Sequence, residues 1–306
     1  MKLFLIKCLI AGSIVSVSVF LLLEFMGSYI DPFYNKFTSG RQSSLIIGDS
    51  KSFQGLQPAV LDDKLANSFE IPIYNYSFTI KEVVYGDRLL ENIKEKLKPD
   101  TKNGLFILSV SPWVLTEREG DNIAKNEFSE MELVPCNMEN VSMNPNLEYI
   151  LTNFENLAFK SIFRRNSQTY SDGWMEDKHM APNIATKKAW EKVQLTNSRN
   201  LTKKWRKSTY RLQKLSETIA FLQKHGTVYL IRMPSGASLT DIENKYWNNF
   251  DKTISVIAQK NQVPYINFST HNGKYETYDG VHLNKEVGAI FSSVLSDSII
   301  KYEQVK

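Results

Sequence analysis

The chain has 306 residues, of which 42% are hydrophobic and 23% are charged, and 37 basic and 33 acidic side chains leave a formal net charge of +4. These figures exclude a mainly disordered chain, because 17 Phe, 14 Tyr and 5 Trp can fill a sizeable core. The near balance of basic and acidic residues also gives no support to nucleic-acid binding, because nucleic-acid-binding proteins are usually strongly basic.

The chain opens with an apolar segment. Residues 8–23 carry no charge, and Lys2 and Lys7 precede them. A membrane-spanning helix needs about 17–25 apolar residues, and positive charge favours the cytoplasmic side. We therefore predict an N-terminal membrane anchor over residues 1–26, with the rest of the chain extracytoplasmic in the cell envelope. A cleaved signal peptide and a buried helix are the alternatives, although no A-x-A cleavage pattern follows the run. Residues 27–42 are predicted to be a tether.

Short apolar segments alternate with helix-like segments from residue 43 to residue 306. The strand-like segments are 44–48, 69–75, 105–110, 227–232 and 263–268, and the helix-like ones are 52–65, 81–98, 185–224, 242–260 and 285–302. This alternation predicts an α/β domain, a three-layer α/β/α sandwich around a parallel sheet. Residues 112–184 interrupt it without a clear strand, and we expect an insertion above the sheet.

The first predicted strand ends at Gly48-Asp49-Ser50. Ligands bind at the carboxyl ends of parallel strands, and a helix beginning there offers free N–H groups. Ser50 is therefore a candidate nucleophile, and its own N–H is a candidate oxyanion donor. The alternative is that Asp49 or Ser50 only caps a helix.

A second polar block, Tyr278-Asp279-Gly280-Val281-His282, follows the last predicted strand. A serine hydroxyl needs an adjacent base, and histidine suits that role when a carboxylate orients its ring. We predict His282 as the base and Asp279 as its partner. Taken singly, these residues are better explained as a turn, a cap or a packed histidine. A serine after the first strand together with Asp-x-x-His after the last strand is hard to explain by caps.

Gly48-Asp49-Ser50 resembles the first block of the SGNH/GDSL hydrolase superfamily, and Asp279-Gly280-Val281-His282 resembles its last block. The resemblance implies a flavodoxin-like fold and ester hydrolysis or acyl transfer through an acyl-serine, with no cofactor. The anchor, the Gly-Asp-Ser and the Ser-x-Ser-Pro stretch further resemble membrane-tethered members that modify envelope polymers, such as the D-alanyl-lipoteichoic acid transfer proteins. This implies a glycan or acylated polymer as substrate and a membrane acyltransferase as partner.

The middle blocks depart from the family pattern. No glycine stands in residues 74–79, so we expect the N–H of Thr79 or Ile80 to serve as an oxyanion donor. Ser111 stands near the place of the family's asparagine, and its shorter hydroxyl is a candidate donor. Loss of one donor costs about 3 kcal/mol of transition-state stabilisation. A catalytically weak scaffold that binds a glycan or a partner is therefore the alternative function.

Further candidates lie near the expected site. Arg232 ends the fourth predicted strand and is a candidate for binding an anionic substrate group, with an ion pair to a neighbouring carboxylate as the alternative. Lys51 is expected to face solvent. Trp113 is a candidate for stacking on a sugar. The same prediction applies to three more rings of the insertion, Tyr170, Trp174 and His179. The alternative for these aromatic residues is a local hydrophobic cluster that holds the insertion down.

No metal site is predicted. His179, His225 and His271 lack metal-ligand spacing, and Cys8 and Cys136 are too far apart in sequence and context to predict a disulfide. No G-x-G-x-x-G or P-loop string follows a strand, so a nucleotide-binding role lacks support.

Overall fold

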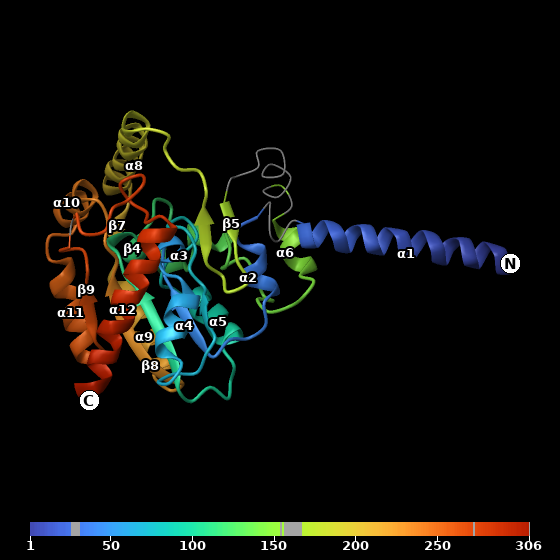
Figure 1. Ribbon diagram of the computed structural model, residues 1–306, viewed down its shortest axis with the longest axis horizontal. Coiled ribbons are helices and arrows are strands. Elements are labelled where there is room, and N and C mark those ends of the chain that lie inside the picture. Colours follow the sequence, from blue (N-terminus) through green and yellow to red (C-terminus); the bar gives the residue numbers. More distant parts are fainter. Residues whose placement is uncertain (26–30, 154, 156–166, 272, 306) are drawn as a thin grey trace.

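The computed structural model describes residues 1–25, 31–153, 155, 167–271 and 273–305. Its centre is a five-stranded sheet in the order β2-β1-β3-β8-β9, and every neighbouring pair is parallel (Figure 1). The strands are β1 (Ser44–Ile47), β2 (Ile73–Asn75), β3 (Gly104–Ser109), β8 (Gly226–Arg232) and β9 (Tyr265–Asn267). The predicted parallel, flavodoxin-like sheet is confirmed.

Helices cover both faces of this sheet, and two separate apolar cores lie beneath them. Alternation along β1 explains the two cores, because Leu45 and Ile47 belong to one and Ile46 belongs to the other. One face carries α5 (Asp87–Lys96), α9 (Thr209–Leu222) and α11 (Phe250–Lys260), and the other carries α4 (Pro58–Leu65) and α12 (Lys285–Val305). The three-layer α/β/α sandwich is therefore as predicted.

Two predicted helices outside the chain between β3 and β8 are each broken once. The segment 52–65 forms α3 (Ser50–Gly55) and α4, which begins at Pro58. Proline has no N–H and fixes its φ angle, so it suits the first turn of a new helix. The segment 242–260 forms α10 (Ala237–Tyr246) and α11.

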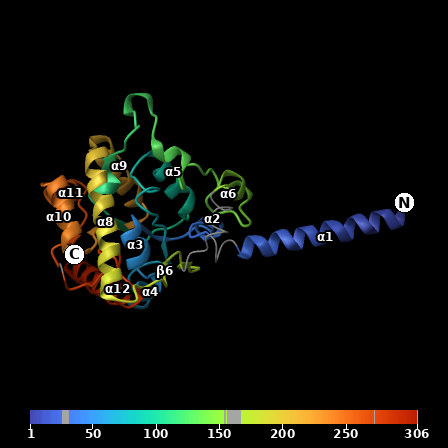
Figure 2. The same ribbon diagram turned by 90° about the horizontal axis from the view of Figure 1, so that it is seen from above.

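The apolar N-terminus forms α1 (Lys2–Phe25), which extends away from the rest of the molecule in Figures 1 and 2. Its window of 21 residues from Lys2 to Leu22 has a mean hydropathy of 2.3 and buries none of its surface in the protein. By length and composition this helix can cross a membrane, as an anchor or as a signal sequence.

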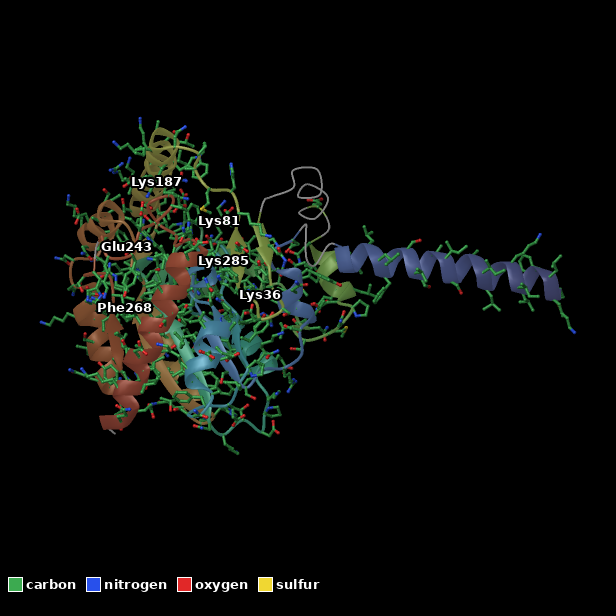
Figure 3. The ribbon with its side chains drawn as sticks, viewed as in Figure 1. Lys36, Lys81, Lys187, Glu243, Phe268 and Lys285 are labelled. Atoms are coloured by element: carbon green, nitrogen blue, oxygen red, sulfur yellow. The ribbon has the colours of Figure 1, made fainter. Side chains whose placement is uncertain are left out.

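The predicted tether is wrong for its described part, residues 31–42. This segment forms α2 (Tyr34–Thr38), and Phe33 and Phe37 belong to a core of the domain. The Lys36 ammonium group is fully buried, where it donates to Asn75 O and to Gly173 O (2.7 Å), and burial lowers its pKa well below the ordinary value. Aromatic packing and this buried ammonium hold the segment on the domain (Figure 3).

The chain between β3 and β8 is the region that the sequence predicted least well. Its short elements are η2 (Pro112–Leu115), β4 (Thr116–Glu117), η3 (Ile123–Lys125), η4 (Ser129–Glu132), α6 (Leu147–Thr152), β5 (Ser167–Thr169), β6 (Met175–Asp177) and β7 (Arg206–Lys207). Contrary to the prediction it contains strands, in the antiparallel pairs β5–β6 and β4–β7. The predicted helix 185–224 is two helices, α8 (Ile184–Lys204) and α9, with β7 between them.

Helix α8 has a different environment from α9. Helix α9 buries an apolar face on the sheet, whereas Ser198 is the one buried residue of α8. Helix α8 packs against α10 and stands at the top of the domain in Figure 1. Its polar inner face therefore borders the region at the carboxyl ends of the strands rather than the core.

Candidate active site

The turn after β1 presents Ser50 at the N-terminus of α3. Asp49 caps this helix, because its Oδ1 accepts a hydrogen bond from Lys51 N (3.0 Å). The backbone at Gly48 passes so close to β3 that an added Cβ would lie 2.5 Å from the Ser109 Cβ. A side chain at position 48 would therefore displace the turn that carries Ser50.

The second turn carries Asp279 and His282. Asp279 Oδ1 accepts hydrogen bonds from Val281 N (3.0 Å) and His282 N (2.8 Å), which folds the carboxylate back onto its own turn. Gly280 has a φ of +87°, a left-handed conformation that glycine adopts without strain. The sequence Asp-Gly-x-His thus places a carboxylate beside the imidazole.

The two turns meet, and the three predicted side chains form a continuous relay. Ser50 Oγ lies 2.8 Å from His282 Nε2, and His282 Nδ1 lies 2.8 Å from Asp279 Oδ2. With the proton on Nδ1, Nε2 accepts the hydrogen bond from the Ser50 hydroxyl, which is the arrangement required of a general base. Ser50 retains 9% of its exposure and Asp279 4%, so the relay is largely shielded from solvent.

Asp279 is held ionised. Burial acts to raise its pKa, but the charge of His282 and the hydrogen bonds from His282 and Val281 outweigh it and bring the pKa to about 2. A fourth hydrogen bond reaches the same carboxylate from Gln194 of α8, whose Nε2 donates to Asp279 Oδ2 at 2.9 Å. Sequence analysis missed Gln194, because an amide within a polar helix carries no local signal.

Gln194→Ala is expected to lower kcat for a simple ester about tenfold, because a hydrogen bond to a charged group contributes about 1.5 kcal/mol. The lost bond positions Asp279, which in turn orients His282. Initial rates with para-nitrophenyl acetate measure this effect. Lys192→Ala, on the exposed side of the same helix, is the matched control. Equal rates for both variants would contradict a positioning role for Gln194.

The structure leaves three of the candidate oxyanion donors available and excludes the fourth. No hydrogen bond among the described residues uses the N–H of Ser50, Thr79 or Ile80, and all three residues line one cavity of about 430 Å³. These N–H groups remain candidates. Ser111 is wrong as a candidate, because its buried hydroxyl donates to Asp49 Oδ2 (2.7 Å) and holds the capping carboxylate.

The residues at and after the end of β2 support the turn that carries Ser50 in a way that their sequence did not reveal. Asn75 Nδ2 donates to Ser52 O (2.9 Å) and to Leu56 O (3.0 Å), and the Ser52 hydroxyl donates to Ser77 Oγ (3.0 Å). Asn75 and Ser77 at the end of β2 therefore fix the short helix α3 against the sheet. Fixed in this way, α3 keeps Ser50 within reach of His282.

Arg232 is wrong as a substrate-binding residue. Its side chain is fully buried and bound by acceptors of the protein, with its Nη atoms 2.9 Å from Glu243 Oε2 and 2.9 Å from Asp251 Oδ2. The ion-pair alternative is the observed one. Lys51 was also expected to face solvent, but it is buried beside Ser50 and its Nζ lies 3.0 Å from Glu243 Oε1.

Glu243 of α10, labelled in Figure 3, is the shared partner of these two cations. Although burial acts to raise its pKa, the Lys51 and Arg232 charges hold the pKa below the ordinary value. The carboxylate also accepts the indole N–H of Trp113 (3.0 Å). One buried acid thus holds the residue after the nucleophile, the end of β8 and an aromatic ring of the cavity wall.

Glu243→Ala is expected to destabilise the domain by about 3–5 kcal/mol, because it leaves Lys51 and Arg232 buried without their shared counter-ion. Denaturant unfolding of the full chain in mild detergent, followed by circular dichroism, measures the loss. Glu95→Ala removes a partner of Arg41 from an exposed pair and should cost less than about 1 kcal/mol. Equal costs for the two variants would contradict the network.

The predicted aromatic residues divide into two groups. Trp113 lines the 430 Å³ cavity beside Ser50 and stacks on Tyr246 at 5.4 Å. Trp174 follows the alternative prediction, because it is buried, stacks on Tyr170 at 4.9 Å and donates its indole N–H to Gln54 O (2.7 Å). His179 is exposed, and its ring centroid lies 5.0 Å from that of Trp190. Sequence analysis did not consider Trp190.

Within the described residues, no three His, Cys, Asp or Glu side chains lie close enough together to hold a metal ion. Of the two cysteines, Cys8 is exposed and Cys136 is buried, and each is a free thiol.

No family model matches this sequence, and no curated protein matches it. Solved structures of similar fold include a carbohydrate acetylesterase from Sinorhizobium meliloti, with a TM-score of 0.42 and 8% identity over 86% of this chain and 100% of that one. A lipase/acylhydrolase from Enterococcus faecalis has a TM-score of 0.39 and 12% identity over 84% of this chain and 95% of that one. A putative acylhydrolase from Bacteroides fragilis has a TM-score of 0.36 and 11% identity over 85% and 86%.

A likeness at this level says nothing about the reaction, so the chemistry rests on the side chains described above. What this chain has in common with the SGNH/GDSL hydrolases is the parallel flavodoxin-like sheet and the two terminal blocks that bring Ser50, His282 and Asp279 together.

Proposed function

We propose that this chain is a serine esterase or O-acyltransferase that works through an acyl-Ser50 intermediate. The observation that supports it is the unbroken series of contacts from Ser50 Oγ through His282 to Asp279, with 2.8 Å at each step. A buried carboxylate, an imidazole and a hydroxyl in this order make the hydroxyl a nucleophile at neutral pH.

In the acylation half, Ser50 Oγ forms a bond to the ester carbonyl carbon while its proton passes to His282 Nε2. Negative charge moves to the carbonyl oxygen, and the N–H of Ser50 with that of Thr79 or Ile80 would stabilise it in the 430 Å³ cavity. The tetrahedral intermediate then collapses, the carbon–oxygen bond to the alcohol breaks, and the alcohol leaves with the proton from Nε2. Asp279 stays ionised and stabilises the imidazolium throughout.

In the deacylation half, a second hydroxyl compound gives its proton to His282 Nε2 and attacks the acyl-Ser50 carbon. The bond to Ser50 Oγ breaks and Ser50 regains its proton. If the second compound is water, the reaction is hydrolysis, and if it is an alcohol, the acyl group is transferred. The same side chains perform both reactions, so access of the acceptor decides between them.

The proposed setting is the cell envelope. Helix α1 would anchor the chain in the membrane, with Lys2 and Lys7 on the cytoplasmic side and the catalytic domain outside. The proposed substrate is an acylated glycan or polymer of the envelope, and a membrane acyltransferase is the proposed partner. Anchoring would favour a substrate fixed near the membrane, because it raises the local concentration of the enzyme there.

The alternative of a non-catalytic scaffold, suggested by the altered middle blocks, would be favoured by a Ser50 that stands well away from His282. They are in hydrogen-bond contact instead, and Asp279 receives four hydrogen bonds that fix it beside the ring. A scaffold would have no need of so complete a relay, so this observation favours the enzyme.

Covalent labelling tests the proposal. The full chain in mild detergent should react with a fluorophosphonate probe, which phosphonylates an activated serine without needing the correct alcohol or acyl group. Ser50→Ala should remain unlabelled, and His282→Ala should label far more slowly because the hydroxyl loses its base. Equal labelling of the wild type and Ser50→Ala would remove the nucleophile from the proposal.

A further inference from the structure

The catalytic histidine borders two hollows, not one. The first is the 430 Å³ cavity that contains Ser50 and Thr79. The second has a volume of about 330 Å³ and contains Asp279 and Tyr278. His282 and Gln194 line both. The relay can therefore be approached from two sides.

The first hollow suits the acyl half of an ester. It holds Ser50 and the free N–H groups of Thr79 and Ile80, where the carbonyl oxygen must lie during attack. Its remaining wall includes several large apolar side chains: Leu201, Trp205, Leu239 and Val281. An acyl chain is apolar beyond its carbonyl group, so it would bury its surface against these side chains.

The second hollow has a different chemical character. Trp190 and His179 are part of its wall, and Tyr278 stacks on the His282 ring with 5.9 Å between centroids. Asp177 adds a carboxylate and Gln54 an amide. Rings together with carboxylate and amide groups suit a polyhydroxylated compound, whose hydroxyls need both donors and acceptors and whose C–H faces pack on rings.

The Gln54 side chain on the wall of the second hollow is bound to the protein through its carbonyl oxygen. Gln54 is 7% exposed, and its Oε1 accepts a hydrogen bond from the Tyr278 hydroxyl (2.7 Å). Among the hydrogen bonds of the described residues, none uses the Gln54 NH2 group as a donor. This NH2 group is therefore free to donate to a hydroxyl of a compound bound in the second hollow.

We infer that the two hollows divide the ester between them: the first holds the acyl group, and the second holds the alcohol, which is a saccharide or a similar polyhydroxylated compound. This inference rests on the proposed function. The oxygen of the leaving alcohol takes its proton from His282 Nε2 beside Ser50, and the rest of the alcohol would extend past the ring into the second hollow, which His282 and Gln194 also line. For acyl transfer, the same hollow would hold the acceptor alcohol.

Substrate pairs that differ only in the alcohol test the inference. The full chain in detergent is assayed with para-nitrophenyl acetate and with mono-O-acetylated glucose, and the ratio of the two kcat/KM values is compared between variants. Trp190→Ala should lower kcat/KM for the acetylated sugar about tenfold more than for the aryl ester. Asp177→Asn, which preserves shape, should shift the ratio in the same direction. Lys192→Ala, exposed on the same helix, is the control and should leave the ratio unchanged.

The outcomes separate this inference from the proposed function. A wild type that neither reacts with a fluorophosphonate nor cleaves para-nitrophenyl acetate overturns both. A wild type that does both but leaves acetylated glucose intact overturns only the second hollow as a saccharide site. The saccharide site is also overturned if Trp190→Ala and Asp177→Asn lower kcat/KM equally for both substrates, or leave the ratio of the two values unchanged. Circular dichroism must show that both variants are folded.

Discussion

Ser50→Ala is expected to reduce kcat for para-nitrophenyl acetate by roughly four to six orders of magnitude. The substitution removes the oxygen that would bond to the acyl carbon and leaves the imidazole without its hydrogen-bond donor at 2.8 Å. Alanine is smaller than serine and the site borders a cavity, so the fold should tolerate the change. Release of para-nitrophenol from the purified full chain measures the rate.

The control for this variant is Ser238→Ala, an exposed serine on α10 away from the relay. It should retain the wild-type rate. Adding His282→Ala to Ser50→Ala should lower the rate little further, because residues that act as one unit are not additive. A Ser50→Ala chain with more than about a tenth of the wild-type kcat would contradict the nucleophile assignment.

Asp279→Asn is expected to lower kcat about 10⁴-fold while the geometry of the turn is retained. The asparagine NH2 can donate to His282 Nδ1 in place of the carboxylate, which moves the ring proton to Nε2. In that tautomer Nε2 can no longer accept the Ser50 proton. Steady-state kinetics measures the loss, and Asp297→Asn, an exposed carboxylate on α12, should show none. Wild-type rates in Asp279→Asn would contradict the assigned role.

The same variant has a stability signature. Because the folded-state pKa of Asp279 is about 2 and the unfolded value lies near 3.9, ionised Asp279 adds roughly 2–3 kcal/mol of stability, which is complete above about pH 5. This contribution is lost as the pH falls from about 5 through about 2. The difference in unfolding free energy between wild type and Asp279→Asn should therefore shrink over that range. Urea unfolding at stepped pH values measures it, and a constant difference would contradict the shifted pKa.

The parts of this molecule that could be predicted are those whose structure is indicated by their own residues and immediate neighbours in the sequence. Apolar runs such as Ser44–Ile47 end in small polar residues, and this pattern marks a buried strand and its carboxyl end without knowledge of its neighbours. Ser50 and the Asp279–His282 turn follow the first and last of these strands. The order of a parallel sheet then brings both turns to one edge, so the relay was predictable.

The remainder depends on contacts across long stretches of sequence. Glu243, which forms the buried ion pair with Lys51, is 192 residues away in the sequence. No residue near Lys51 in the sequence indicates that it has a buried partner. Helix α8 lines the site with polar side chains, so its amphipathic pattern is weak, and neither Gln194 nor Trp190 could be assigned to the site from the sequence. Segment 31–42 was predicted to be a tether because the groups that hold it on the domain are distant in sequence, as is Gly173 O, which accepts a hydrogen bond from Lys36.

The most direct test of the central claim is the location of a covalent adduct. The full chain is treated with a fluorophosphonate, digested, and mapped by tandem mass spectrometry. The relay geometry predicts a single modified side chain, Ser50, and loss of that modification when His282 is replaced by alanine. An adduct on any other residue, or the same yield on Ser50 without His282, would contradict it.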